Sequence, residues 1–123
     1  MTNQTTKTQA YLDAWKHQDA AAMHEMLHPQ VSFKGPMAQT EGREAFLSAV
    51  RGMFPMLKDV VVRRLIVDGD HAIAVYDFVC GPPIGICRTA ELITFADGLI
   101  RSSEVFFDAR PFEAMMKARS VAA

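Results

Sequence analysis

The stretch AELITFADGLIRSSEVFFD, residues 90–108, contains two runs rich in β-branched and aromatic residues on either side of Asp97-Gly98. This pattern predicts two antiparallel strands joined by a tight turn. Each run also carries a glutamate, Glu91 or Glu104, among residues that suit an apolar interior. A carboxylate that faces such an interior must be paired, protonated or used in chemistry. The register of the hairpin therefore decides which glutamate is buried.

Two registers agree with this hairpin. A two-residue turn at Asp97-Gly98 places Glu91 directly opposite Glu104, a like-charge pair that destabilises the sheet or raises a pKa. A three-residue loop over 96–98 places Glu91 opposite Ser103, with Arg101 on the diagonal, and turns Glu104 to the other face. Local sequence hardly separates these two registers. A Glu–Arg diagonal is less costly than an unrelieved Glu–Glu pair, and this agrees with the inward Glu91 that the family resemblance described below implies.

The rest of the chain predicts helices first and strands afterwards. Asp19 and Thr40 are suitable N-caps, and Pro29 and Pro55 are suitable helix stops. Helices are expected over residues 7–17, 20–27, 42–54 and 110–120, an extended piece over 31–36, and strands over 59–67, 71–80, 86–95 and 99–108. This order indicates an α+β fold, in which helices pack on one face of a single sheet.

Composition narrows the class of protein. The 123 residues suit one domain, 1–123; half of them are apolar, and the net charge is −1. Without a basic stripe we expect no nucleic-acid partner, and without a run of about 20 apolar residues we expect no membrane span. The polar N-terminus and a reduced Cys80–Cys87 pair predict a cytoplasmic protein. No metal-ligand spacing or phosphate-binding loop occurs, so we expect no metal and no cofactor.

Three segments carry a resemblance to a known family. AYLDAWKHQDAAAMHEMLHPQVSF (10–33), GREAF (42–46) and FADGLIRSSEVFFDARPF (95–112), in this order, resemble the nuclear-transport-factor-2-like superfamily, and more narrowly its ketosteroid-isomerase and SnoaL-like branch. The resemblance implies a cone: a curved antiparallel or mixed sheet around an apolar pocket that the three N-terminal helices close. It also implies a homodimer, for which the outward residues Ala90, Leu92 and Ile100 would offer an apolar patch.

The resemblance assigns roles to a few positions. Tyr11 and Glu91 match the tyrosine and the protonated acid that bind a developing oxyanion in ketosteroid isomerase. The general base of that enzyme falls at Gly35, and the acid of SnoaL-like cyclases and related epoxide hydrolases falls at Val105, so both familiar bases are missing. Tyr11 also has the interpretation of a core tyrosine.

The strand 71–80 leaves its inward face open. Matching the family's inward positions places Val75, Asp77 and Val79 in the pocket, although Tyr76 and Phe78 are the alternative. An inward Asp77 would lie near Glu91, and two close carboxyl groups that share a proton suit acid–base chemistry. The alternative is a buried acid satisfied by Arg101, Arg88 or a backbone amide.

Two functions follow from these assignments. One is a cofactor-independent isomerase, cyclase or hydratase for an apolar or polycyclic substrate, in which Tyr11 and Glu91 polarise an oxygen and Asp77 moves a proton. The other is a non-catalytic member that binds a ligand or serves as a dimeric scaffold. The predicted ligand-binding residues, several of which also suit a core role, are Trp15, Phe33, Phe46, Phe54, Val75, Arg101, Ser103 and Phe107.

Overall fold

The structure of the protein is a computed structural model that describes residues 3–122. Its elements in order are α1 (Asn3–Lys16), α2 (Ala20–Met26), β1 (Leu27–Lys34), β2 (Gln39–Glu41), α3 (Arg43–Met53), the 3₁₀-helix η1 (Phe54–Met56), β3 (Leu57–Asp68), β4 (His71–Cys80), β5 (Ile86–Ala96), β6 (Leu99–Phe106) and α4 (Arg110–Ala122). The predicted α+β class is confirmed.

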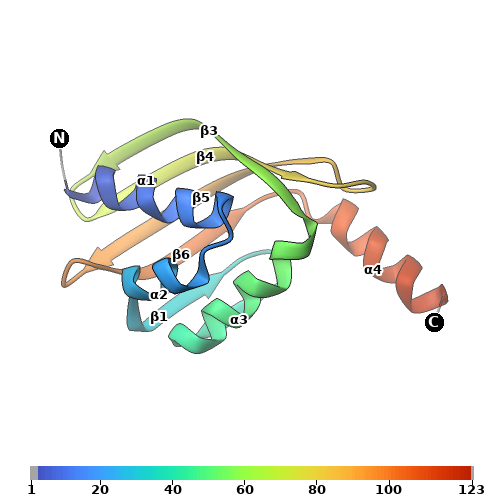
Figure 1. The fold of residues 1–123 in the computed structure, drawn as a ribbon, viewed down its shortest axis with the longest axis horizontal. Helices are drawn as coiled ribbons and strands as arrows, with labels where there is room; N and C mark the ends of the chain where they lie inside the picture. Colours follow the sequence, from blue (N-terminus) through green and yellow to red (C-terminus); the bar gives the residue numbers. More distant parts are fainter. Residues whose placement is uncertain (1–2, 123) are drawn as a thin grey trace.

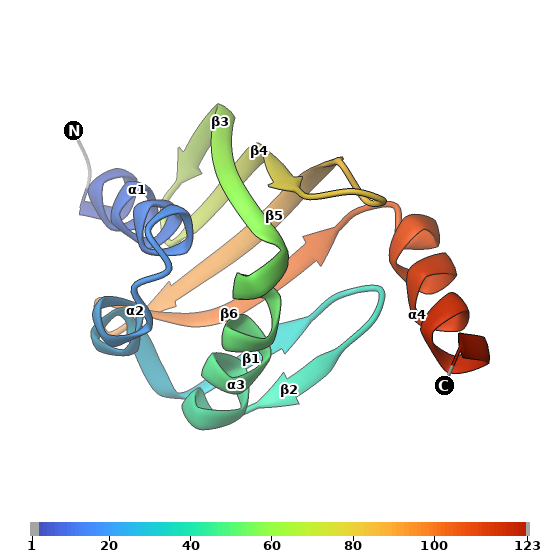
Figure 2. The same ribbon diagram turned by 45° about the vertical axis from the view of Figure 1, so that its right-hand side comes forward.

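All six strands belong to one curved sheet in the order β2-β1-β6-β5-β4-β3. β1 runs parallel to β6, and the other neighbouring strands are antiparallel. Helices α1, α2 and α3 lie on one side of the sheet, while α4 stands at one end of it (Figures 1 and 2). The core fills the space between these layers, where Leu12, Phe46 and Ile93 are fully buried.

Local signals account for the helix boundaries only in part. Asp19 caps α2 as predicted, because its carboxylate accepts a hydrogen bond from the Ala22 amide at 3.0 Å. Thr40 is not the predicted cap: it lies in β2, and Gly42, with φ +90°, precedes α3 without a side-chain cap. Pro29 lies inside β1, which begins directly after α2 and is longer than the predicted extended piece.

The β5–β6 hairpin follows neither of the two predicted registers along its whole length. Asp97 and Gly98 both have positive φ, as a two-residue type I′ turn requires, and Ala96 pairs with Leu99. A bulge then leaves Arg101 without a partner in β5, so that Glu91 pairs with Val105. Glu91 is nevertheless the inward glutamate, with 1% of its surface exposed.

The same bulge changes which residues of β6 face the helices. Ile100 lies on the inner face and is buried, so the predicted outward patch is wrong for this residue. Ala90 and Leu92 do lie on the outer face, opposite Phe106 and Glu104. Helices α1, α2 and α3 leave that outer face open (Figures 1 and 2). Five large apolar side chains are exposed on it, and we call them the outer patch: Val61, Ile66, Ile73, Ile86 and Phe106.

Candidate functional site

The most deeply buried carboxyl group among the described residues, that of Glu91, accepts hydrogen bonds from hydroxyl groups of three elements. Tyr11 of α1 donates to Glu91 Oε2 at 2.8 Å, and Ser103 of β6 donates to the same oxygen at 2.5 Å. Tyr76 of β4 donates to Glu91 Oε1 at 2.7 Å. All four residues are buried. The carboxylate is therefore held by hydroxyl groups alone, with no cation among its hydrogen-bond partners in the described chain.

This environment shifts three pKa values in the same direction. Burial raises the pKa of Glu91, although the hydrogen bonds from Ser103, Tyr76 and Tyr11 oppose that shift. Burial, followed by the nearby Glu91 charge, raises the pKa of Tyr11 and of Tyr76 well above the ordinary tyrosine value. Both tyrosines therefore keep their protons as donors, and Glu91 is the group of the cluster that exchanges one.

The proton on Glu91 determines what the tyrosines can do. An ionised carboxylate accepts all three hydroxyl hydrogen bonds at once. A protonated carboxyl group donates one hydrogen bond, so one of these hydroxyl groups must accept it and is released to donate elsewhere. Because Tyr11 and Tyr76 both line the cavity described next, a released tyrosine hydroxyl can donate to a ligand oxygen. The cluster thus couples proton uptake to hydrogen-bond donation.

Glu91 lies at the polar end of an apolar cavity of about 440 Å³, which is within the usual size of small-molecule sites. Aromatic and sulfur-containing side chains predominate in its wall, and Glu91 is the only acidic residue that lines it in the described chain. Residues of the wall other than the tyrosines and Glu91 include Met37, Ala38, Phe46, Ala49, Val50, Met53, Met56, Thr89, Phe107, Phe112, Met115 and Met116. An apolar molecule with one polar oxygen fits this lining.

Trp15 joins the aromatic wall to the polar cluster. Its ring contacts Phe78 edge to face at a centroid distance of 5.3 Å. Its indole Nε1 is buried and has no hydrogen-bond partner within the described residues, although its proximity opposes part of the rise that burial causes in the pKa of Tyr11. As the single tryptophan of the chain, Trp15 is a natural fluorescence reporter for the occupancy of this cavity.

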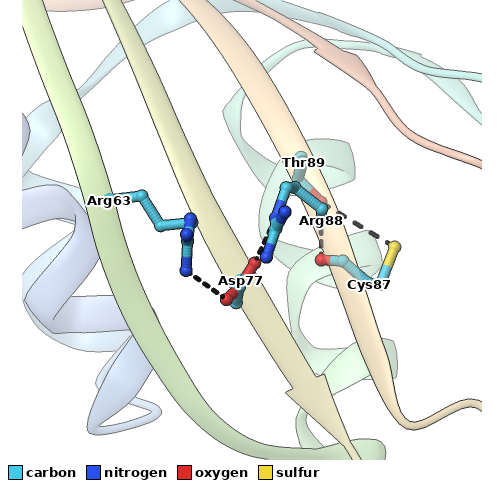
Figure 3. A network of polar contacts seen from close by, with 5 residues as sticks. All are labelled: Arg63, Asp77, Cys87, Arg88 and Thr89. Atoms are coloured by element: carbon cyan, nitrogen blue, oxygen red, sulfur yellow. Dashed lines mark hydrogen bonds and ion pairs between the residues drawn. The ribbon is translucent and has the colours of Figure 1, made fainter.

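Asp77 lies on the outer face of the sheet, which corrects the prediction that it faces the pocket. Arg88 donates to Asp77 Oδ1 at 2.9 Å and Arg63 donates to Asp77 Oδ2 at 3.3 Å (Figure 3). The hydrogen bond from Arg88 is the main reason why the pKa of Asp77 is lowered. Tyr76 and Phe78 face the cavity in its place. Asp77 and Glu91 therefore do not form an acid pair, and the pairing of Asp77 with Arg88 is the alternative that the structure supports.

The other predicted ligand-binding residues divide into two groups. Trp15, Phe33, Phe46 and Phe107 line the cavity, together with Tyr11 and Glu91. Phe54, Val75, Arg101 and Ser103 do not. Phe54 packs edge to face against Trp15, and Val75 shares the outer face with Asp77. Arg101 donates to the backbone oxygen of Gln30 instead of contacting Glu91, because the bulge turns it away. Ser103 contributes to the site through its hydrogen bond to Glu91.

Gly35 and Val105 stand at the two positions that match acids of the related enzymes. They lie next to one another in the cavity wall. A Cβ atom placed on Gly35 would lie 2.7 Å from Val105 Cγ2 and 3.4 Å from Phe33 Cζ. Both residues line the cavity. A side chain at position 35 therefore cannot coexist with Val105 unless one of them moves.

Sequence reasoning missed several wall residues. Tyr76 was one of two open alternatives, because both faces of β4 are apolar apart from Asp77. Cys87 also lines the cavity, and burial raises the pKa of its thiol. Burial, together with the proximity of Cys87, raises the pKa of Cys80 to about 11. Both thiols are free, as predicted. Met115, Met116 and Arg119 come from α4, whose packing no local pattern indicated.

Two further properties concern residues 3–122 as a whole. No group of three or more His, Cys, Asp and Glu side chains in this range comes together as a metal site. None of the helices in the same range is both long and apolar enough to span a membrane.

Comparisons with known proteins identify the family and agree with the fold. The family model described as a SnoaL-like domain matches residues 8–103. A protein from Kribbella flavida has a similar structure, with a TM-score of 0.85, 25% identity and 94% of each chain covered. Another Kribbella flavida protein, provisionally described as a ketosteroid isomerase, has a TM-score of 0.78 at 18% identity, over 86% of this chain and 78% of its own.

An epoxide hydrolase from M. tuberculosis also shares the fold, with a TM-score of 0.73 at 17% identity, over 96% of this chain and 95% of its own. At these two lower identities the likeness concerns the fold. No curated protein matches the sequence.

Proposed function

We propose that this chain, which belongs to the SnoaL-like domain family of the nuclear-transport-factor-2-like superfamily, is an acid–base enzyme. It works with its own side chains on an apolar carbonyl or hydroxyl compound. The reaction class is isomerisation, cyclisation or hydration. The observation that supports this proposal is the buried Glu91 with Tyr11 and Tyr76 at the polar end of an apolar cavity.

Glu91 is the proton-transfer group in this proposal. Its ionised form removes a proton from a carbon next to the substrate carbonyl, and its raised pKa makes it a stronger base than a solvated glutamate. Once protonated, Glu91 donates a hydrogen bond to one tyrosine oxygen, and that tyrosine, which keeps its proton, donates a hydrogen bond to the developing oxyanion. Return of the proton to a different carbon completes an isomerisation. Asp77 has no part in these steps, because it lies on the outer face.

A second candidate is a non-catalytic ligand-binding protein. It is favoured by the absence of a side-chain base at Gly35 and Val105, and by the outward position of Asp77. In that case Glu91 would serve only to hold one polar atom of a ligand. Both candidates use the same cavity, so the experiment must separate chemistry from binding.

Exchange of carbon-bound hydrogen separates them. The two-ring ketone 2-tetralone is incubated with the protein in D₂O, and the loss of its α-proton signals is followed by NMR. We expect the wild type to accelerate exchange and Glu91→Gln to lose about a hundred-fold of that acceleration, as removal of a general base does. Tyr76→Phe should lose less, because Tyr11 remains as a donor.

Circular dichroism identifies the variants that remain folded, and quenching of Trp15 fluorescence reports binding of the ketone. A folded Glu91→Gln protein that exchanges the ketone as fast as the wild type contradicts the proposal. A wild type that binds the ketone without accelerating exchange supports the second candidate.

A further inference from the structure

A second cavity adjoins the first at its α4 end. It also has a volume of about 440 Å³ and lies between η1, the β4–β5 loop and α4. The two cavities share three lining residues, Met56, Met115 and Arg119. A ligand that extends past these shared side chains would therefore reach from the apolar cavity into the second one.

Positive charge gathers at the second cavity. Glu91 lines the first cavity only, Lys58 lines the second only, and Arg119 lines both at the place where they adjoin. The Lys58 stem crosses Gly81, since a Cβ placed on that glycine would lie 3.3 Å from Lys58 Cε. Neither cation takes part in the ion pairs found among the described residues. Two exposed cations without a carboxylate partner thus border the second cavity.

We propose that the ligand is an amphipathic anion: an apolar body with a polar oxygen at Glu91 and one anionic group, such as a carboxylate, held by Lys58 and Arg119. This inference rests on the proposed function for the Glu91 end. The orientation follows from electrostatics, because an anionic group beside Glu91 would be repelled in the buried site, whereas at Lys58 and Arg119 it is attracted. Arg119 can hold two oxygens of one carboxylate, and Lys58 contributes a point charge.

A matched pair of fluorescent probes tests this inference. Anilinonaphthalene sulfonate and phenylnaphthylamine share the same aromatic groups and differ in the sulfonate. Dissociation constants for both are measured by fluorescence titration with the wild type, Arg119→Met, Lys58→Met and Lys117→Met. Lys117→Met is the matched control, because it removes one positive charge from α4 without lining either cavity.

We expect the sulfonate compound to bind the wild type more tightly than the neutral compound. Arg119→Met and Lys58→Met should each weaken sulfonate binding about three- to five-fold, as loss of a partly screened ion pair does, and leave the neutral compound unchanged. Equal affinities of the wild type for both compounds overturn the inference, as does an equal loss in Lys117→Met.

Ala49→Trp places a bulky side chain in the first cavity and checks the location of the probes. It should abolish binding of both; sulfonate binding that survives it lies elsewhere and overturns the inference. Failure of the proposed function would look different. In that case Glu91→Gln would leave ketone exchange unchanged while the sulfonate preference persists.

Discussion

The contact between Gly35 and Val105 predicts both the sign and the size of the change in unfolding free energy when Gly35 is replaced. Gly35 does not have a positive φ, so replacing it by alanine would ordinarily stabilise the protein by about 0.4–1 kcal/mol through the unfolded chain. Here the added Cβ would lie 2.7 Å from Val105 Cγ2, well inside the roughly 3.5–4.0 Å at which carbon atoms attract. We therefore expect Gly35→Ala to destabilise the protein by about 2 kcal/mol, as overpacking does.

The neighbours leave little room for this contact to relax. Val105 is buried, it is β-branched, and its strand β6 is paired on both sides, by β5 and β1. Val105→Ala removes the obstructing methyl groups. In that background Gly35→Ala should be neutral or slightly stabilising, which gives a coupling energy of about 2–3 kcal/mol between the two positions.

Urea unfolding of the four proteins, followed by circular dichroism at pH 7, measures this coupling. Equal m values in the four curves are the control, since they show that the variants unfold between comparable states. The reasoning is refuted if Gly35→Ala changes the unfolding free energy equally with valine and with alanine at position 105. A confirmed coupling would predict that an acid introduced at position 35 is tolerated better with a small residue at position 105.

Three further predictions concern charge and assembly. The raised pKa of Glu91 means that its neutral form favours folding: this stability is complete below the pKa of an unfolded glutamate and is lost as the pH rises through the raised value. Melting curves should therefore show wild-type stability falling, relative to Glu91→Gln, as the pH rises above about 4.3; parallel pH profiles would contradict this. The lowered pKa of Asp77 has the opposite consequence, so the wild type should be more stable than Asp77→Asn at pH 7, and the gap should close in acid as Asp77 is protonated. The same variant should retain ketone exchange, and a loss in the folded protein would restore a catalytic role to Asp77. The homodimer stays a prediction, and we now expect its interface at the outer patch. Native mass spectrometry should show a dimer for the wild type and a monomer for Phe106→Glu. A dimer that survives this change does not use the patch.

Much of the fold is readable from local sequence because its signals act over a few residues. Asp19 caps α2, Asp97-Gly98 makes a tight turn, and runs rich in β-branched and aromatic residues define β4 and β5. The inward position of Glu91 was also predicted, although the register argument that led to it was wrong. A single unpaired residue, Arg101, shifted the pairing, and the hairpin sequence offered no signal for a bulge there.

The sequence by itself determined the fold class and the order of the elements apart from β2, and the family resemblance placed Tyr11 and Glu91 at one site. Tertiary structure decided the rest of the site. Asp77 faces outward because Arg63 and Arg88, from two neighbouring strands, neutralise its charge there. Since adjacent residues of a strand face opposite sides, Tyr76 takes the inner position beside Glu91. Arg119 reaches the cavity only because α4 packs against its open end. Each of these outcomes depends on neighbours far apart in the chain, which local propensity does not encode.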